Sequence, residues 1–106
     1  MSGTPRRVRA TPDFFGDLDR QLGAERGPNG EPSRADFQAF ELLRIVERFA
    51  VDWDQLAQPV PGRPDYRVLI AAGVLVRAIA VVGQLAADGA IELVRLHIDS
   101  DIDPDW

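Results

Sequence analysis

The 106-residue sequence contains no cysteine, no lysine and a single histidine, His97. The absence of cysteine excludes a disulfide scaffold, a thiol nucleophile, an iron–sulfur cluster and any zinc site with sulfur ligands. One histidine excludes a metal site built from several imidazoles. Because lysine is absent, Schiff-base chemistry is impossible, and all 12 basic side chains are arginines. We therefore expect neither a metal nor a cofactor.

Little in the sequence would direct it into a membrane. The first ten residues carry three arginines, but no apolar segment follows them, so we expect no secretory signal and a cytoplasmic protein. The longest apolar stretch, residues 68–87, is interrupted by Gly73, Arg77 and Gly83. An arginine at the centre of a bilayer costs about 2.5–3.5 kcal/mol. This stretch is therefore interpreted as buried strands and not as a membrane span.

Acidic residues outnumber basic ones by 17 to 12, which gives a formal net charge of −5. Residues 99–106 contribute four of the aspartates and no arginine, so the rest of the chain is nearly neutral. The acidic balance argues against generic nucleic-acid binding, although a neutral body can still gather arginines on one face. The length predicts one domain, residues 1–106, that ends in a solvated acidic tail, residues 99–106.

The first half of the chain has the signals of two helices. Thr11 is a good N-cap and Gly23 a good C-terminal stop, which predicts a helix over Pro12–Leu22. Ser33 caps a second helix that runs to about Ala50. The apolar residues recur at helical spacing: Phe14, Phe15, Leu18 and Leu22 in the first helix, and Ala39, Phe40, Leu42, Leu43, Val46, Phe49 and Trp53 in the second.

The second half predicts three antiparallel strands, Tyr66–Ala72, Leu75–Leu85 and Ile91–Ile98, because apolar runs are separated by the turn signal Asp88-Gly89. A short alternating segment, residues 7–10, is expected to form a further strand. The expected fold is therefore α+β, with two N-terminal helices on one face of an antiparallel sheet. Strict alternation in the last strand puts Glu92, Val94, Leu96 and Ile98 on one face, so that both of its faces are mixed.

The hairpin turn also predicts which residues face each other. A two-residue turn places His97 opposite Ala80 and Arg95 opposite Val82. In that register Arg77 points to the opposite face from His97. A bulge would reverse this parity, so the relative placement of Arg77 and His97 stays open.

Several short motifs follow one another in a fixed order: Val8-Arg9-Ala10-Thr11-Pro12, Phe15-x-x-Leu18, Tyr66-Arg67-Val68, Gly73, Arg77, Asp88-Gly89 and Ile91-Glu92-Leu93-Val94-Arg95-Leu96-His97. In this order they cover most of the chain, and together with the expected strand, helices and meander they resemble the RelE/ParE superfamily, the toxins of type II toxin–antitoxin systems. The resemblance implies a cognate antitoxin as partner. It also implies a toxin that inhibits translation at the ribosome and its mRNA, or DNA topology through DNA gyrase.

The messenger-RNA-cleaving branch of this family needs no metal, because it surrounds the scissile phosphate with cations and supplies groups for proton transfer. Carried over to this chain, the resemblance implies catalytic roles for Arg77 and His97, and substrate or target contacts for Arg67 and Arg95. The chain departs from the family pattern, since it has no lysine and Ala80 stands where tyrosine is common. These departures favour a binding toxin over a ribosome-dependent endoribonuclease. A protein-interaction domain of the same fold without toxic activity is the remaining alternative.

Each of these residues also has a purely structural interpretation. An arginine in a strand, such as Arg67, is more often a solvated or acid-paired residue than a phosphate contact. A buried Arg77 needs an acidic partner or an open cleft. A lone histidine at a strand end, such as His97, is often structural or simply exposed.

Overall fold

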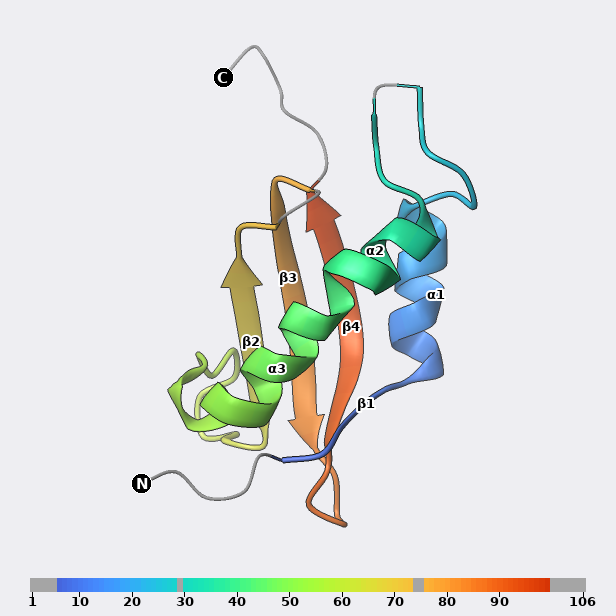
Figure 1. The fold of residues 1–106 in the computed structure, drawn as a ribbon. Helices are drawn as coiled ribbons and strands as arrows, with labels where there is room; N and C mark the ends of the chain where they lie inside the picture. The colour runs from blue at the N-terminus through green and yellow to red at the C-terminus, as the bar shows by residue number, and fades with distance from the viewer. Residues whose placement is uncertain (1–5, 29, 74–75, 100–106) are drawn as a thin grey trace.

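The computed structural model describes residues 6–28, 30–73 and 76–99 and places helices on one face of a four-stranded sheet (Figure 1). The α+β class is confirmed. None of the helices in these three ranges is both long and apolar enough to span a bilayer. The elements in chain order are β1 (Val8–Ala10), α1 (Pro12–Gln21), α2 (Arg34–Phe40), α3 (Leu42–Asp52), a 3₁₀ turn (Trp53–Gln55), β2 (Tyr66–Ala71), β3 (Ala78–Leu85) and β4 (Ile91–Asp99).

The strand order is β1-β4-β3-β2. β2, β3 and β4 form the expected antiparallel meander, but β1 pairs with β4 in parallel, from Val8 opposite Ile91 to Ala10 opposite Leu93. The expectation of a wholly antiparallel sheet was therefore wrong. A short hairpin turn forces its two strands to be antiparallel, whereas the long helical connection between β1 and β4 allows them to run in the same direction.

Both helix starts lie where the sequence predicts them. The Thr11 side chain accepts a hydrogen bond from the backbone N–H of Phe14, and Pro12 is the first residue of α1. Ser33 and Asp36 form a reciprocal capping box at the start of α2. The Arg26 guanidinium and the Ser33 backbone N–H stabilise the ionised carboxylate of Asp36, which lowers its pKa to about 2.

The single second helix expected over residues 33–50 is instead divided at Glu41 into α2 and α3. The Glu41 side chain is only 1% exposed, and its carboxylate lies 3.7 Å from the Arg44 guanidinium. Because this buried carboxylate is turned toward the sheet, its neighbours are rotated outward, and Phe40 and Leu43 are 56% and 71% exposed. These two residues were expected in the core. Phe49, further along α3, is fully buried as expected.

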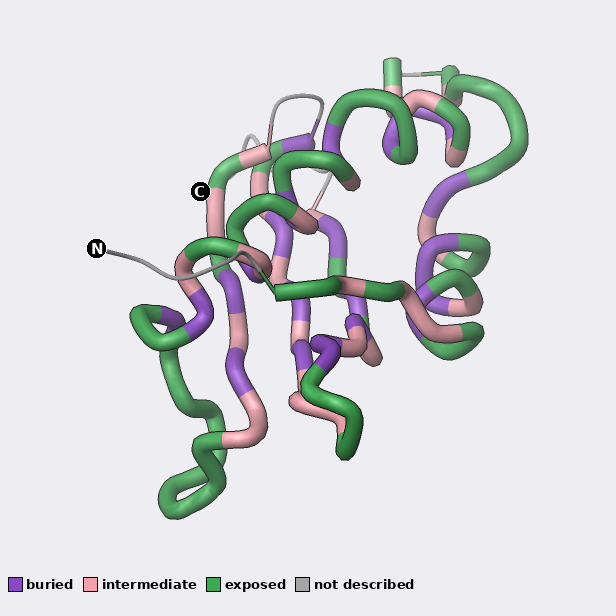
Figure 2. The backbone as a smooth tube through the Cα atoms, turned by 60° about the horizontal axis from the view of Figure 1, so that its bottom comes forward, coloured by how far each residue is buried: buried purple, intermediate pink, exposed green. Residues whose placement is uncertain are grey.

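The core lies between α1, α2, α3 and the sheet, where buried and less buried residues alternate along the strands (Figure 2). Gly83 of β3 allows α3 to approach the sheet, because a Cβ atom at this position would lie 2.6 Å from the Phe49 ring. The largest fully buried apolar side chains are Phe14, Phe37, Phe49, Leu18, Ile45, Ile91, Leu93 and Val81.

The β3–β4 hairpin combines two irregularities that compensate each other. Its loop has three residues and not two, because the Ala86 N–H donates to the Ala90 carbonyl, and Gly89 closes it at a φ of +88°. β4 then contains a bulge at Val94, since Val82 is opposite Arg95 but Gly83 is opposite Leu93. The extra residue in β4 offsets the extra residue in the loop.

The bulge preserves the expected pairs of His97 with Ala80 and of Arg95 with Val82. It also makes the expectation of two mixed faces wrong. Leu93 and Leu96 are both buried, whereas Arg95 and His97 are exposed, so the side facing the helices is apolar along the whole strand.

The close approach of α3 at Gly83 yields the first prediction. We expect Gly83→Ala to destabilise the fold by about 1–3 kcal/mol in urea unfolding, because the new methyl group overlaps the Phe49 ring. The control is Gly16→Ala in α1, where the nearest atom is a flexible arginine nitrogen 3.5 Å away. That control is expected to stabilise the fold by up to about 1 kcal/mol. Equal stability of Gly83→Ala and the wild type would refute this packing.

Candidate functional site

The candidate site is the sheet face that the helices leave uncovered, here called the open face. β4 contributes Arg95 and His97, which are both exposed. Beside them β3 contributes Val82 and Ala80, and β2 contributes a further pair, Val68 and Ile70, by the strand register. The open face therefore combines small and medium apolar side chains with Arg95 and His97 of β4, and Gln84 and Tyr66 lie further along β3 and β2 on the same face.

Arg95 reaches from the open face to α1. Its Nε lies 3.2 Å from the carboxylate of Asp17, which is 3% exposed. The same carboxylate accepts a 2.8 Å hydrogen bond from the Leu96 backbone N–H and pairs with Arg20. Arg95 thus lies at the border of the open face, with one edge of its guanidinium bonded to a structural carboxylate.

Arg77 and His97 lie at the same end of the β3–β4 pair. Arg77 immediately precedes β3, so the alternation that was expected to turn it away from His97 does not apply to it. Its Nε is 4.0 Å from the carboxylate of Asp99, and its backbone N–H donates to the Asp99 carbonyl. Asp99 is two residues after His97 on β4 and shares its face. The register of a two-residue hairpin turn also places Arg77 opposite Ser100, which lies outside the described residues.

Arg67 faces the helices and not the open face, and it is 8% exposed. Its guanidinium donates to the backbone carbonyls where α3 and the 3₁₀ turn end, and it lies 5.6 Å from the centre of the Trp53 ring. This position gives Arg67 a structural role, in which it satisfies helix-end carbonyls that would otherwise be buried without partners. The four acceptors are the carbonyls of Trp53, Asp54, Leu56 and Pro64.

Arg9 of β1, which lies beside the first residues of β4, is also paired with carboxylates. Arg9 donates to Asp88 at 3.0 Å and to Glu92 at 3.1 Å. These bonds raise the pKa of Arg9, and the bond from Arg9 lowers the pKa of Asp88. The pKa of Glu92 is lowered first by its bond from Gln84 and then by the bond from Arg9.

The three arginines around the open face, Arg9, Arg77 and Arg95, are therefore each matched by a carboxylate. A phosphate group would have to share each guanidinium with a carboxylate that is already bonded to it, so these arginines are not preorganised for a phosphate alone. This arrangement favours recognition of a surface with mixed charges over tight binding of a polyanion. Within the described ranges, no group of three or more histidine, aspartate or glutamate side chains could hold a metal ion.

Sequence reasoning missed the two α1 side chains that complete this site, Asp17 and Gln21. Asp17 anchors Arg95, while Gln21 bonds to the backbone of Leu96 and Ile98. Both polar residues lie close to the apolar positions of α1, and that is the signal that could have identified them. A polar residue beside an apolar stripe often contacts a neighbouring element.

No family model, no curated protein and no solved structure matches this chain.

The position of Arg67 gives the second prediction. We expect Arg67→Ala to lower the free energy of unfolding by about 2–3 kcal/mol, because the substitution leaves buried carbonyls without their charged donor. The control is Arg48→Ala on α3, whose guanidinium pairs with Asp52 at the surface and is 49% exposed. That pair should contribute less than about 1 kcal/mol. An Arg67→Ala variant with unchanged stability but impaired target binding would assign Arg67 to the binding surface.

Proposed function

We propose that this chain is a RelE/ParE-like toxin component of a toxin–antitoxin pair, and that it acts by binding its target and not by cleaving RNA. The observation that carries the second part is the pairing of Arg9, Arg77 and Arg95 with carboxylates around the open face. Charge stabilisation of a scissile phosphate needs cations that are preorganised for the phosphate. A protein surface, in contrast, carries groups of both charges, so it can form ion pairs with these arginines and with their carboxylates.

Two features support the first part of the proposal. The chain runs from strand to helices to a three-strand meander, in the order that the motif resemblance implies. The resemblance also includes a branch that inhibits DNA gyrase by binding alone, and a largely apolar face bordered by ion pairs suits such a role. A protein-interaction domain of the same fold without toxic activity is the alternative.

An endoribonuclease is the second candidate, because one observation favours it. Arg77 and His97 lie at the same end of β4, next to Asp99. A cation and an imidazole on one surface can stabilise a phosphate and transfer a proton. The two functions therefore differ in what His97 does.

The third prediction separates them. We expect induction of the chain to arrest growth without new messenger-RNA ends on translating ribosomes, and His97→Ala to leave the arrest unchanged. Arg95→Ala should weaken target association by about 1–3 kcal/mol, because it removes a charged hydrogen bond. Arg26→Ala is the matched control, since Arg26 is also exposed and paired with an aspartate, Asp36 of α2, but lies on the helix side of the sheet.

New cleavage sites that disappear with His97→Ala would instead establish the ribonuclease. Induction without any growth arrest would favour the protein-interaction domain. For each outcome, thermal melting of the purified variants must show that they are folded at the assay temperature, so that a loss of effect is not a loss of fold.

The proposed antitoxin yields a fourth prediction. A partner segment is expected to cover apolar side chains of the sheet that are open to solvent, such as Ile70, which is 73% exposed. Co-expression with the neighbouring reading frame should therefore yield a complex on a sizing column. Elution of two separate proteins at micromolar concentration would count against the toxin–antitoxin assignment.

A further inference from the structure

The two outer edges of the sheet are covered to different degrees. On the β4 side, β1 pairs with the first residues of the strand, and Asp17 and Gln21 bond to the backbone of Leu96 and Ile98 further along. The β2 edge has a single isolated bridge within the part of the chain that the structure describes, between Ala57 and Val68. The protein thus covers one edge along most of its length and leaves part of the other accessible.

The accessible part begins at Ile70. Outward-facing backbone groups alternate along an edge strand, and Val68 uses its outward N–H to donate to Ala57 at 2.9 Å. The next outward-facing residue is Ile70, whose side chain is 73% exposed on the open face. The N–H and C=O groups of Ile70 can therefore pair with one residue of an added strand.

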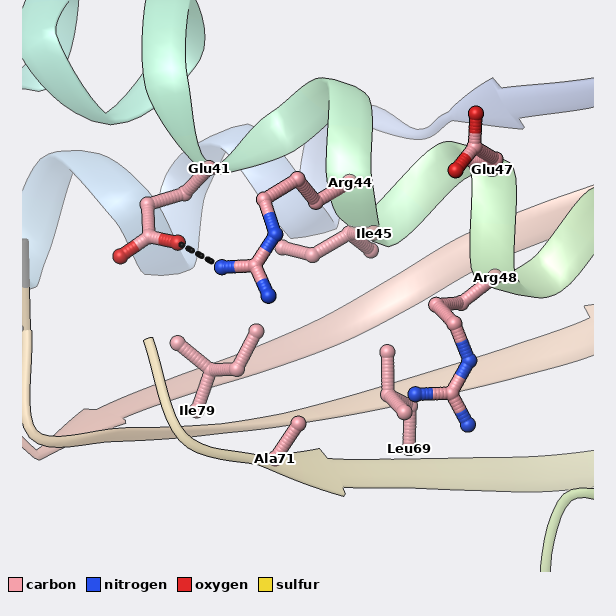
Figure 3. A pocket seen from close by; sticks show the side chains of 8 residues that line it. All are labelled: Glu41, Arg44, Ile45, Glu47, Arg48, Leu69, Ala71 and Ile79. Carbon is pink, nitrogen blue, oxygen red and sulfur yellow. Dashed lines mark ion pairs between the residues drawn. The ribbon is translucent and has the colours of Figure 1, made fainter. Parts of the chain in front are cut away.

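A groove runs beside this edge, between β2 and α3. One pocket of about 180 Å³ lies between Arg44 and Ala71, and a second of about 210 Å³ continues toward Ala57. Arg48 and Leu69 line both pockets, which makes them one groove. Figure 3 shows its apolar lining between Arg44 and Ala71, with Leu69, Ala71 and Ile79 on the strands and Ile45 on α3.

The helix side of the groove carries two arginines, Arg44 and Arg48, together with Glu41 and Glu47. Figure 3 shows the guanidinium groups of Arg44 and Arg48 directed toward the strands and the carboxylate of Glu47 directed away from them. Arg44 lies 3.7 Å from Glu41, and the Nε of Arg48 lies 2.9 Å from Asp52. Because a guanidinium has five N–H groups in a planar fork, one ion pair leaves donors for a second carboxylate.

A segment of this same sequence has the matching pattern. Residues 101–103 read Asp-Ile-Asp, so in an extended conformation both aspartates share one face and Ile102 lies on the other. Antiparallel to β2, with Ile102 opposite Ile70, the aspartates fall opposite Ala71 and Leu69. Those positions lie beside Arg44 and Arg48.

The residue that follows this segment, Pro104, is consistent with this register. Pro104 would lie opposite Val68, where the edge is already occupied by Ala57. Proline has no backbone N–H and cannot continue the hydrogen-bond ladder. The pairing would therefore end where the accessible edge ends.

The segment cannot reach this edge in its own molecule. Asp101 is two residues from Asp99, a span of at most about 7 Å. The position outside β2 is three strand spacings away from β4, about 14 Å. The segment must therefore come from a second copy of the chain.

We propose that residues 101–103 of one copy add as a strand to the β2 edge of a second copy, with Asp101 and Asp103 bonded to Arg44 and Arg48 and Ile102 packed on Ile70. Reciprocal exchange of the two segments gives a symmetric dimer. This inference does not depend on the toxin assignment, because it needs no target and no antitoxin. The acidic tail expected to be solvated then acts as a self-association segment.

The fifth prediction tests this dimer by sedimentation velocity of the full chain. Each exchanged segment is short, so we expect a reversible dimer with a dissociation constant on the order of 10–100 µM. Asp101→Asn/Asp103→Asn and Arg44→Gln/Arg48→Gln should each weaken it at least about tenfold, since each removes charged hydrogen bonds. Arg63→Gln is the control, because Arg63 resembles Arg48 in exposure and aspartate pairing but lies outside the groove.

A charge exchange separates direct contact from a general effect of charge. Arg44→Glu/Arg48→Glu and Asp101→Arg/Asp103→Arg should each abolish the dimer alone and restore it when both are present in one chain. A wild-type chain that stays monomeric up to about 0.5 mM would overturn the proposal. A dimer that survives the tail substitutions, or a combined variant that does not recover it, would overturn it as well.

Discussion

Val94 is the residue of β4 without an opposite partner on β3, and the placement of Arg95 and His97 depends on it. Without the bulge, the alternation that buries Ile91 and Leu93 would turn Arg95 and His97 toward the helices and Leu96 and Ile98 toward solvent. Burial of two charged or polar side chains beneath α1 and α3 would cost several kcal/mol. The bulge instead keeps the core side apolar and places both polar side chains on the open face.

Several arginines of this protein bond one part of the chain to another. Arg67 satisfies buried carbonyls at a helix end, Arg95 pairs with the carboxylate that bonds to the β4 edge, and Arg9 joins β1 to the hairpin turn. An acidic protein with neutralised arginines is poorly suited to hold a polyanion. It is better suited to surfaces of mixed charge, and both proposed interactions, with a protein target and with a second copy, are of that kind.

The features that the sequence predicts correctly are the ones set by interactions between residues close in the sequence. Thr11, Ser33 and Asp88-Gly89 act through bonds to residues at most a few positions away, so the sequence indicates two helix starts and the hairpin directly. The bulge at Val94, the interruption at Glu41 and the burial of Arg67 each depend on contacts between elements far apart in the sequence. The register was nevertheless correct, because the longer loop and the bulge shift it by one residue in opposite directions. For the candidate site, the sequence pointed to Arg77, Arg95 and His97 as candidates, but it gave no indication of the carboxylates that accompany them.

The bulge is tested most directly by cross-strand backbone contacts between β3 and β4 measured by NMR in solution. The structure predicts contacts of Val82 with Arg95 and of Ala80 with His97, together with contacts of Gly83 with Leu93 and of Gln84 with Glu92, so that Val94 alone lacks an opposite residue. A single uninterrupted register, with Gly83 opposite Val94 and Gln84 opposite Leu93, would contradict it. In that case Ile91 and Leu93 would lie on the open face beside Arg95 and His97, and the helix side of β4 would lose two of its buried apolar residues.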